Sequence, residues 1–140
     1  MMIRIAGFVC VLLLLAITPL IAHHSFAAQY DEKKPVDLKL VVTKLEWMNP
    51  HVWIYGDLKE ANGKVVKWEC EASNPNMLAR RGLKRDFLKA GEQVTIQGFR
   101  AKNGTQVMSV TWVLWPDGRK VFAGSVVPGE GPSSYSVKPQ

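Results

Sequence analysis

The chain has 140 residues, of which 47% are hydrophobic, and its 18 basic and 12 acidic side chains give a formal net charge of +6. This length suits one small domain. The basic residues are spread along the chain and do not gather into one long basic run. With two cysteines in all, Cys10 and Cys70, a disulfide framework is excluded and a packed core has to supply the stability.

Residues 1–22 have the pattern of a cleaved signal peptide. Arg4 precedes an almost wholly apolar run from Ile5 to Ala16, and Pro19 breaks the helix before a small residue, Ala22. Removal of this segment takes away one base and leaves a net charge of +5. The alternative is an uncleaved anchor, since the apolar run is nearly as long as a membrane span of about 20 residues.

We predict cleavage after Ala22, with a second candidate site after Ala27. The mature protein is therefore expected in the bacterial periplasm or outside the cell. Only Cys70 remains after cleavage, on the apolar side of a predicted strand. We expect a buried, inert thiol; the alternative is a reactive or metal-ligating one.

The mature chain is expected to begin with an extended arm, residues 23–35. A first strand from Val36 to Trp47 alternates with period 2 and then slips phase near Thr43-Lys44, which predicts a β-bulge and a bend. A second strand, His51 to Lys59, and a third, Lys64 to Glu71, flank an Asn-Gly hairpin turn and are expected to be antiparallel neighbours.

The second half of the domain is predicted to hold a helix, more strands and a tail. Asn74 to Arg81 has helix-capping signals, and a further helical turn is expected in residues 83–90. Two strands are expected next, at Glu92 to Ala101 and at Thr105 to Trp115, followed by a short edge strand at Lys120 to Ala123. The C-terminal tail, residues 124–140, is expected to be disordered.

The predicted order is three strands, a short helix and then two strands, and it indicates an all-β chain. We expect a five-stranded barrel of the oligonucleotide/oligosaccharide-binding (OB) type over residues 36–123, with the helix between strands three and four. A sandwich would need more strands and no helix. The faces expected to fill the core are Leu38-Leu40, Val66-Trp68, Val94-Ile96 and Val110-Trp112-Leu114.

Three stretches carry a family resemblance: His23 to Ala27, the Trp47 to His51 turn, and Pro116 to Arg119. With them the chain resembles an uncharacterised family of exported bacterial proteins with a domain of unknown function. The resemblance implies export and an OB-like barrel, and it implies no reaction. Leu40 is a departure, because relatives have glycine in the middle of strand one.

The predicted ligand-binding residues are Trp47, His51, Trp53 and Tyr55. The last three alternate along strand two, so they share one face, which in an OB barrel is the usual ligand face. Aromatic side chains there could stack on a sugar, a base or a peptide ring. The alternation leaves open which side faces the core, and the alternative is that Trp53 is buried while Val52 and Ile54 point outward.

A second hypothesis is a copper site. If cleavage follows Ala22, the amine and imidazole of His23 could chelate Cu(II), with His24 or His51 adding a nitrogen and Met48 a soft ligand for Cu(I). Trp47 or Trp53 could shield the metal. The alternative is that His51 forms a hydrogen bond at its turn while His23-His24 are a solvated end.

Catalysis is not expected, since the sequence has no nucleophile motif, phosphate loop or zinc signature. Glu69 and Glu71 share a strand face, and we interpret them as surface residues. The basic stretch of residues 80–89 suits an anionic envelope surface or a solvated face, and nucleic acid is not an expected partner outside the cytoplasm. The sequence thus predicts an exported, non-enzymatic module that binds an unidentified small ligand or a periplasmic protein.

Overall fold

The computed structural model describes residues 26–125. The described part is predominantly β, as expected, and β1 runs on from a four-residue helix, α2 (Phe26–Gln29). The further elements are β1 (Tyr30–Glu46), β2 (Trp53–Lys59), β3 (Val65–Glu71), α3 (Pro75–Arg80), β4 (Gln93–Ala101), β5 (Val107–Leu114) and β6 (Lys120–Phe122).

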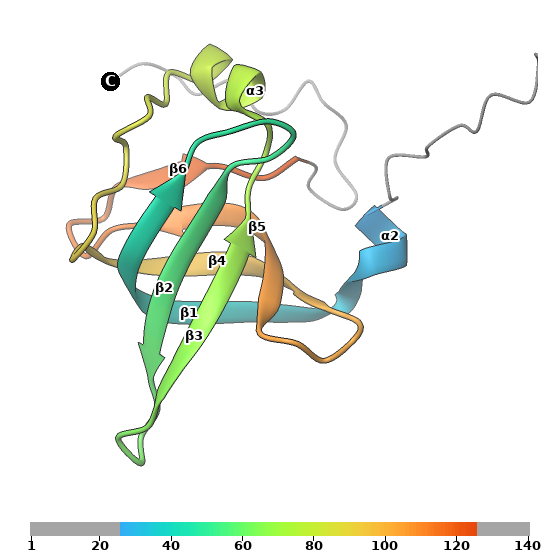
Figure 1. The fold of residues 1–140 in the computed structure, drawn as a ribbon, viewed down its shortest axis with the longest axis vertical. Coiled ribbons are helices and arrows are strands. Elements are labelled where there is room, and N and C mark those ends of the chain that lie inside the picture. The colour runs from blue at the N-terminus through green and yellow to red at the C-terminus, as the bar shows by residue number, and fades with distance from the viewer. Residues whose placement is uncertain (1–25, 126–140) are drawn as a thin grey trace, which may run out of the picture.

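The strands form one sheet in the order β3-β2-β1-β4-β5-β6, and an additional pairing of β3 with β5 closes the first five into a ring (Figure 1). That closing pair is parallel, with Glu71 opposite Ser109, while the other neighbours are antiparallel. The sixth strand is the short edge strand expected at Lys120, and it extends the sheet beyond the five predicted strands.

Strand β1 is the longest element, with 17 residues, and it pairs with β4 along its first part and with β2 along its last. Its register with β2 shifts between Val42 and Lys44, so the predicted bulge is confirmed. It lies just beyond Leu40. The strand also begins six residues before the predicted Val36, because Tyr30 and Pro35 already pair with β4.

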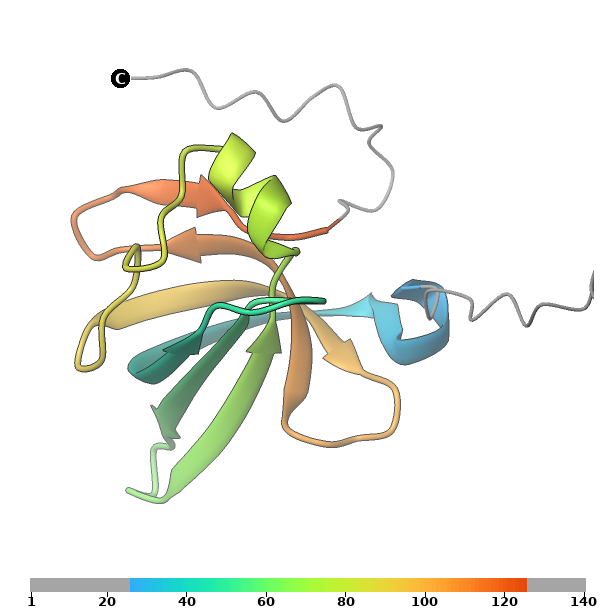
Figure 2. The same ribbon diagram turned by 45° about the horizontal axis from the view of Figure 1, so that its top comes forward.

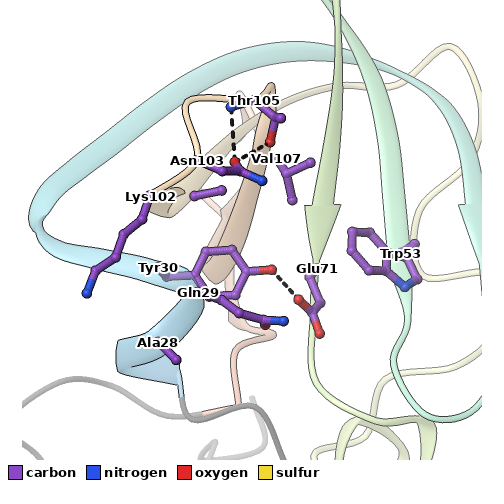
Figure 3. A pocket seen from close by; sticks show the side chains of 10 residues that line it. Ala28, Gln29, Tyr30, Trp53, Glu71, Lys102, Asn103, Thr105 and Val107 are labelled. Atoms are coloured by element: carbon purple, nitrogen blue, oxygen red, sulfur yellow. Dashed lines mark hydrogen bonds between the residues drawn. The ribbon is translucent and has the colours of Figure 1, made fainter.

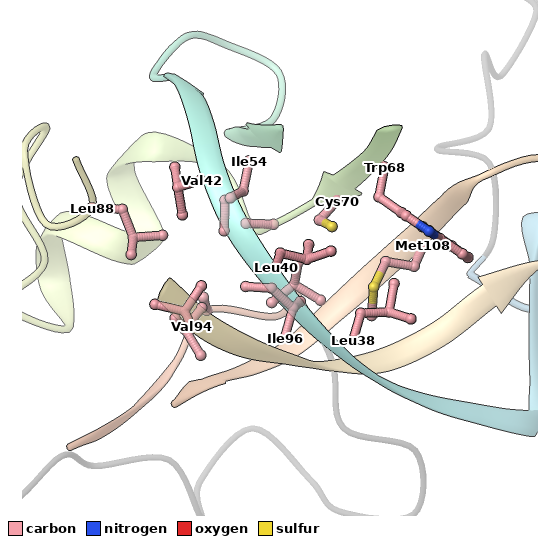
Figure 4. Close-up of a cluster of buried hydrophobic side chains, with 14 of the residues drawn as sticks. Leu38, Leu40, Val42, Ile54, Trp68, Cys70, Leu88, Val94, Ile96 and Met108 are labelled. Atoms are coloured by element: carbon pink, nitrogen blue, oxygen red, sulfur yellow. The ribbon is translucent and has the colours of Figure 1, made fainter. Parts of the chain in front are cut away.

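The core lies inside the ring, where side chains of β1 face those of β2 to β5 (Figure 4). Leu38, Leu40, Val94 and Ile96 are buried as predicted, as is Trp68, while Val66 is only partly buried. About 25 cal/mol for each Å² of apolar surface removed from water makes this burial the main stabilising contribution.

The predicted core face of β5 is wrong in its second half. Trp112 and Leu114 are half-buried on the outside, and Val113 is fully buried instead. The register with β4 shifts between Gln97 and Gly98, and this irregularity reverses the alternation along β5. At Gly98 a Cβ would lie 1.9 Å from the Ser109 carbonyl oxygen, so only glycine permits the close approach.

The helix predicted between strands three and four is confirmed as α3, which lies over one end of the ring (Figure 2). Asn74 caps it, its side-chain oxygen accepting a hydrogen bond from the Met77 amide at 2.9 Å. The second helical turn predicted in residues 83–90 is wrong, because that segment forms turns and bends. Its apolar side chains nevertheless pack inward, Leu88 with 3% exposure.

Candidate functional site

A pocket of about 450 Å³ opens where the first residues of β1 meet the outer face of β2 and β3 and the loop between β4 and β5 (Figure 3). Its lining residues come from segments far apart in the sequence. They are Ala28, Gln29, Tyr30, Trp53, Glu71, Ala101, Lys102, Asn103, Thr105 and Val107.

Glu71, the last residue of β3, joins two of these segments. One carboxylate oxygen accepts a hydrogen bond from the Tyr30 hydroxyl, and the other contacts Nδ1 of His51. The Glu71 side chain is 13% exposed, so its charge is held largely away from solvent. Hydrogen bonds to an ionised acceptor are stronger than neutral ones, and two of them hold the carboxylate in place.

Tyr30 is the buried partner in this arrangement, with 5% exposure. Burial, with a smaller contribution from the nearby Cys70 thiol, raises the pKa of the Tyr30 hydroxyl to about 12. The hydroxyl therefore stays protonated at neutral pH and remains a hydrogen-bond donor to Glu71.

The contact with Glu71 also determines the tautomer of His51. A carboxylate only accepts hydrogen bonds, so Nδ1 of His51 carries the proton that it shares with Glu71. An imidazole oriented by a carboxylate in this way is the usual form of a metal-binding histidine.

The structure shows which side of strand two faces the core, a point that the sequence left open. Val52 and Ile54 are fully buried in the core, and Trp53 and Tyr55 are half-buried on the outer face. Of the two aromatic residues, only Trp53 lines the pocket. Its backbone pairs with that of Glu71, which places the two residues side by side across β2 and β3.

Tyr55 lies two residues after Trp53 on the same face of β2, and its side chain contacts residues of β1. Its hydroxyl donates to Glu46 at 2.9 Å, and the Lys44 ammonium lies 5.4 Å from its ring centre. The hydrogen bonds from Lys44 and Tyr55 lower the pKa of the Glu46 carboxyl, which therefore stays ionised. Tyr55 is thus a neighbour of the pocket and does not line it.

Trp47 and Met48 are placed away from the pocket lining. Trp47 packs against the core, with its ring centre 6.2 Å from that of Phe87, and Met48 is 54% exposed. His23 and His24 lie outside the described residues. Within residues 26–125 no three His, Cys, Asp or Glu side chains are grouped closely enough to hold a metal ion.

Sequence reasoning missed two residues of the site. Glu71 was interpreted as a surface residue like Glu69, but only Glu69 is exposed. Tyr30 was placed in an extended arm, although it is a buried strand residue that reaches Glu71 from 41 positions away. Its only sequence signal is an aromatic side chain just before the alternating part of strand one.

Cys70, next to Glu71, points to the opposite face of β3 and is fully buried, as predicted. Burial raises the pKa of its thiol to about 12, with a further contribution from the Glu69 carboxylate. A thiol in this environment stays protonated, and it is a core side chain and not part of the pocket.

Comparison with known proteins adds a family and no function. Searches of the curated proteins and of the solved structures found no similar protein. Among residues 26–125 no helix has the length and hydropathy needed to span a bilayer. The model of a protein family of unknown function, DUF6152, matches residues 11–109, and this chain therefore belongs to that family.

Proposed function

We propose that the chain is an exported, periplasmic binding module without enzymatic activity, built on an OB-like barrel, which takes a small ligand in the pocket at Trp53 and Glu71. The ring order β1-β2-β3-β5-β4 supports this, because it is the strand order of an OB barrel, with β6 as an addition.

The position of the pocket carries the proposal. OB barrels bind ligands on the face of strands two and three, between the loop that joins strands one and two and the loop that joins strands four and five. Here the pocket is formed by Trp53 of β2, Glu71 of β3, and Lys102, Asn103 and Thr105 of the β4–β5 loop. Its volume lies within the range of about 300–1,000 Å³ that is usual for small-ligand sites.

Hydrogen bonds within the chain connect the segments that form the pocket wall. Lys102 donates a backbone hydrogen bond to Gln29 at 2.9 Å, and its ammonium donates to the Ala27 carbonyl at 2.6 Å. Asn103 accepts hydrogen bonds from the amide and hydroxyl of Thr105 at 3.1 and 2.7 Å. Because this wall is already ordered in the free protein, less conformational entropy is lost when a ligand binds.

The test is a fragment screen by NMR on ¹⁵N-labelled mature protein, with a panel of alkylguanidinium, alkylurea, carboxylate and monosaccharide fragments. We expect at least one class to shift the Trp53 indole signal together with the amides of Glu71 and Lys102. The Trp112 indole, on the outer face of β5, is the internal control. A panel in which no class shifts the pocket signals selectively would overturn the proposal.

We propose a second candidate function, copper binding, on one specific observation. Glu71 contacts both Tyr30 and His51, so the start of β1 lies next to the Asn-Pro-His turn. The segment with His23 and His24 precedes Phe26, whose ring packs on that of Tyr30 at 5.5 Å. The proposed ligands are the His23 amine and imidazole, His24, His51, and Met48 for Cu(I).

N-terminal sequencing of the exported protein tests this candidate first, because a cut after Ala27 removes both N-terminal histidines and refutes it. With a cut after Ala22, Cu(II) titration followed by electron paramagnetic resonance should show nitrogen ligation that weakens about tenfold or more in His51→Ala. Met48→Leu should affect only Cu(I). Equal, weak binding by wild type and His51→Ala would leave the small-ligand module alone.

A further inference from the structure

The protein covers most of its tryptophan rings with its own side chains. Arg100 lies over Trp68 with its guanidinium carbon 5.4 Å from the ring centre, Lys120 over Trp112 at 4.3 Å, and Arg119 over Trp115 at 4.7 Å. A cation within about 6 Å of an indole face is attracted by the ring quadrupole. Trp47 is covered differently, by the ring of Phe87.

Trp53 is the exception. Within residues 26–125 neither a cation nor another aromatic ring is placed against its indole. It is half-buried, lines the pocket, and lies beside Glu71 on the neighbouring strand (Figure 3). The uncovered indole is therefore also the one that faces a cavity and borders a partly buried carboxylate.

The charges around the pocket favour a positive ligand at this point. A carboxylate has about four lone-pair sites, and Tyr30 and His51 account for one each, so Glu71 can still accept hydrogen bonds. Trp53 also pairs with Glu46 on its other side, across β1, but that carboxylate already accepts from Lys44 and Tyr55, so Glu71 is the acceptor left for a ligand. Lys102, a cation among the lining residues, extends away from Glu71 towards the Ala27 carbonyl (Figure 3).

We infer that the pocket binds a compact organic cation, an alkylguanidinium or alkylammonium group, stacked on the Trp53 indole and hydrogen-bonded to the Glu71 carboxylate. The inference rests on the proposed small-ligand function and names its ligand class. The ligand takes the place that Arg100, Lys120 and Arg119 occupy on the other indoles, and the Glu71 carboxylate adds charge-assisted hydrogen bonds to the stacking contact.

The decisive experiment compares two probes of nearly the same shape, n-propylguanidinium and n-propylurea, which differ in charge. Titration of the mature wild-type protein, followed at the Trp53 indole signal and by Trp fluorescence, should show n-propylguanidinium binding about tenfold or more tightly, since a desolvated cation–π contact alone is worth about that factor. Equal or tighter binding of n-propylurea would overturn the cationic class while leaving a small-ligand pocket in place.

Two variants and their matched controls locate the site, with the Lys102 amide as the signal followed in every variant. Glu71→Gln and Trp53→Leu should each weaken n-propylguanidinium binding about tenfold, whereas Glu69→Gln, two residues away and exposed, and Trp112→Leu, on the outer face of β5, should leave it unchanged. Unchanged binding in Glu71→Gln would also overturn the inference. If Glu71→Gln does not fold, the two-probe comparison on the wild type still decides. No pocket shift by any probe would instead refute the small-ligand function itself.

Discussion

Two aromatic regions of one sheet differ in what covers their rings. At β5 and the turn after it, Trp112 and Trp115 lie under Lys120 and Arg119, and the Trp115 indole N–H also donates to Glu92 at 3.3 Å. At β2, Trp53 borders a pocket and a carboxylate instead. An indole covered by the protein's own cation contributes to stability, whereas one kept open beside an anion is available to a ligand.

Truncation of the two indoles should separate stability from binding most clearly. Trp115 is 9% exposed and belongs to the core, so Trp115→Ala should lower the free energy of unfolding by about 3–5 kcal/mol. Trp53→Ala should cost less than about 1.5 kcal/mol, because its ring is half-buried at a pocket. Urea unfolding followed by circular dichroism measures both. Equal losses would mean that Trp53 is a structural residue.

The hydroxyl groups of Tyr30 and Tyr55 offer a second comparison. Tyr30→Phe removes a buried donor from the Glu71 carboxylate, and we expect a loss of about 1–3 kcal/mol in the free energy of unfolding. Tyr55→Phe should cost clearly less, because water can replace its hydroxyl at Glu46 on the half-exposed face. The same urea titration distinguishes them, and a larger effect of Tyr55→Phe would contradict the central role given to Glu71.

Uncovering a ring at β5 should not create a binding site. Lys120→Met removes the cation from Trp112 and should cost about 0.5–1 kcal/mol in the free energy of unfolding. Trp112 pairs with Gln97 and Phe122, neither of which is an anion. Addition of n-propylguanidinium should therefore leave the Trp112 indole signal unshifted in this variant. A shift like that at Trp53 would mean that an open ring suffices and Glu71 is dispensable.

The smallest expected effect is at Cys70, which lies beside Glu71 in sequence but on the core side of β3. With a thiol pKa of about 12 it should not react with iodoacetamide at pH 8 in the native protein, because only roughly one molecule in ten thousand carries the thiolate. Peptide mass mapping should show labelling only after unfolding in urea. Labelling of the native protein would place the thiol in the pocket.

Much of the fold was predictable because its signals are local. The alternation around Leu38 and Leu40, the Asn-Gly hairpin turn and the Asn74 cap each depend on residues that are close in sequence. The bulge after Val42 was predictable for the same reason, since a phase slip is visible in the strand itself. The burial pattern in the second half of β5 was not predictable, because the alternation of buried and exposed side chains reverses where the pairing with Gln97 and Gly98 is irregular.

The candidate site was predictable only in part. The sequence by itself determined that His51, Trp53 and Tyr55 share a face, because side chains alternate along a strand. Only the tertiary structure decided that this face points outward, that Trp53 alone of the three lines the pocket, and that Tyr30 reaches Glu71. The physical reason is the separation along the chain: a contact across 41 residues depends on the register of several strand pairs and the closure of the ring, and no local pattern carries that information.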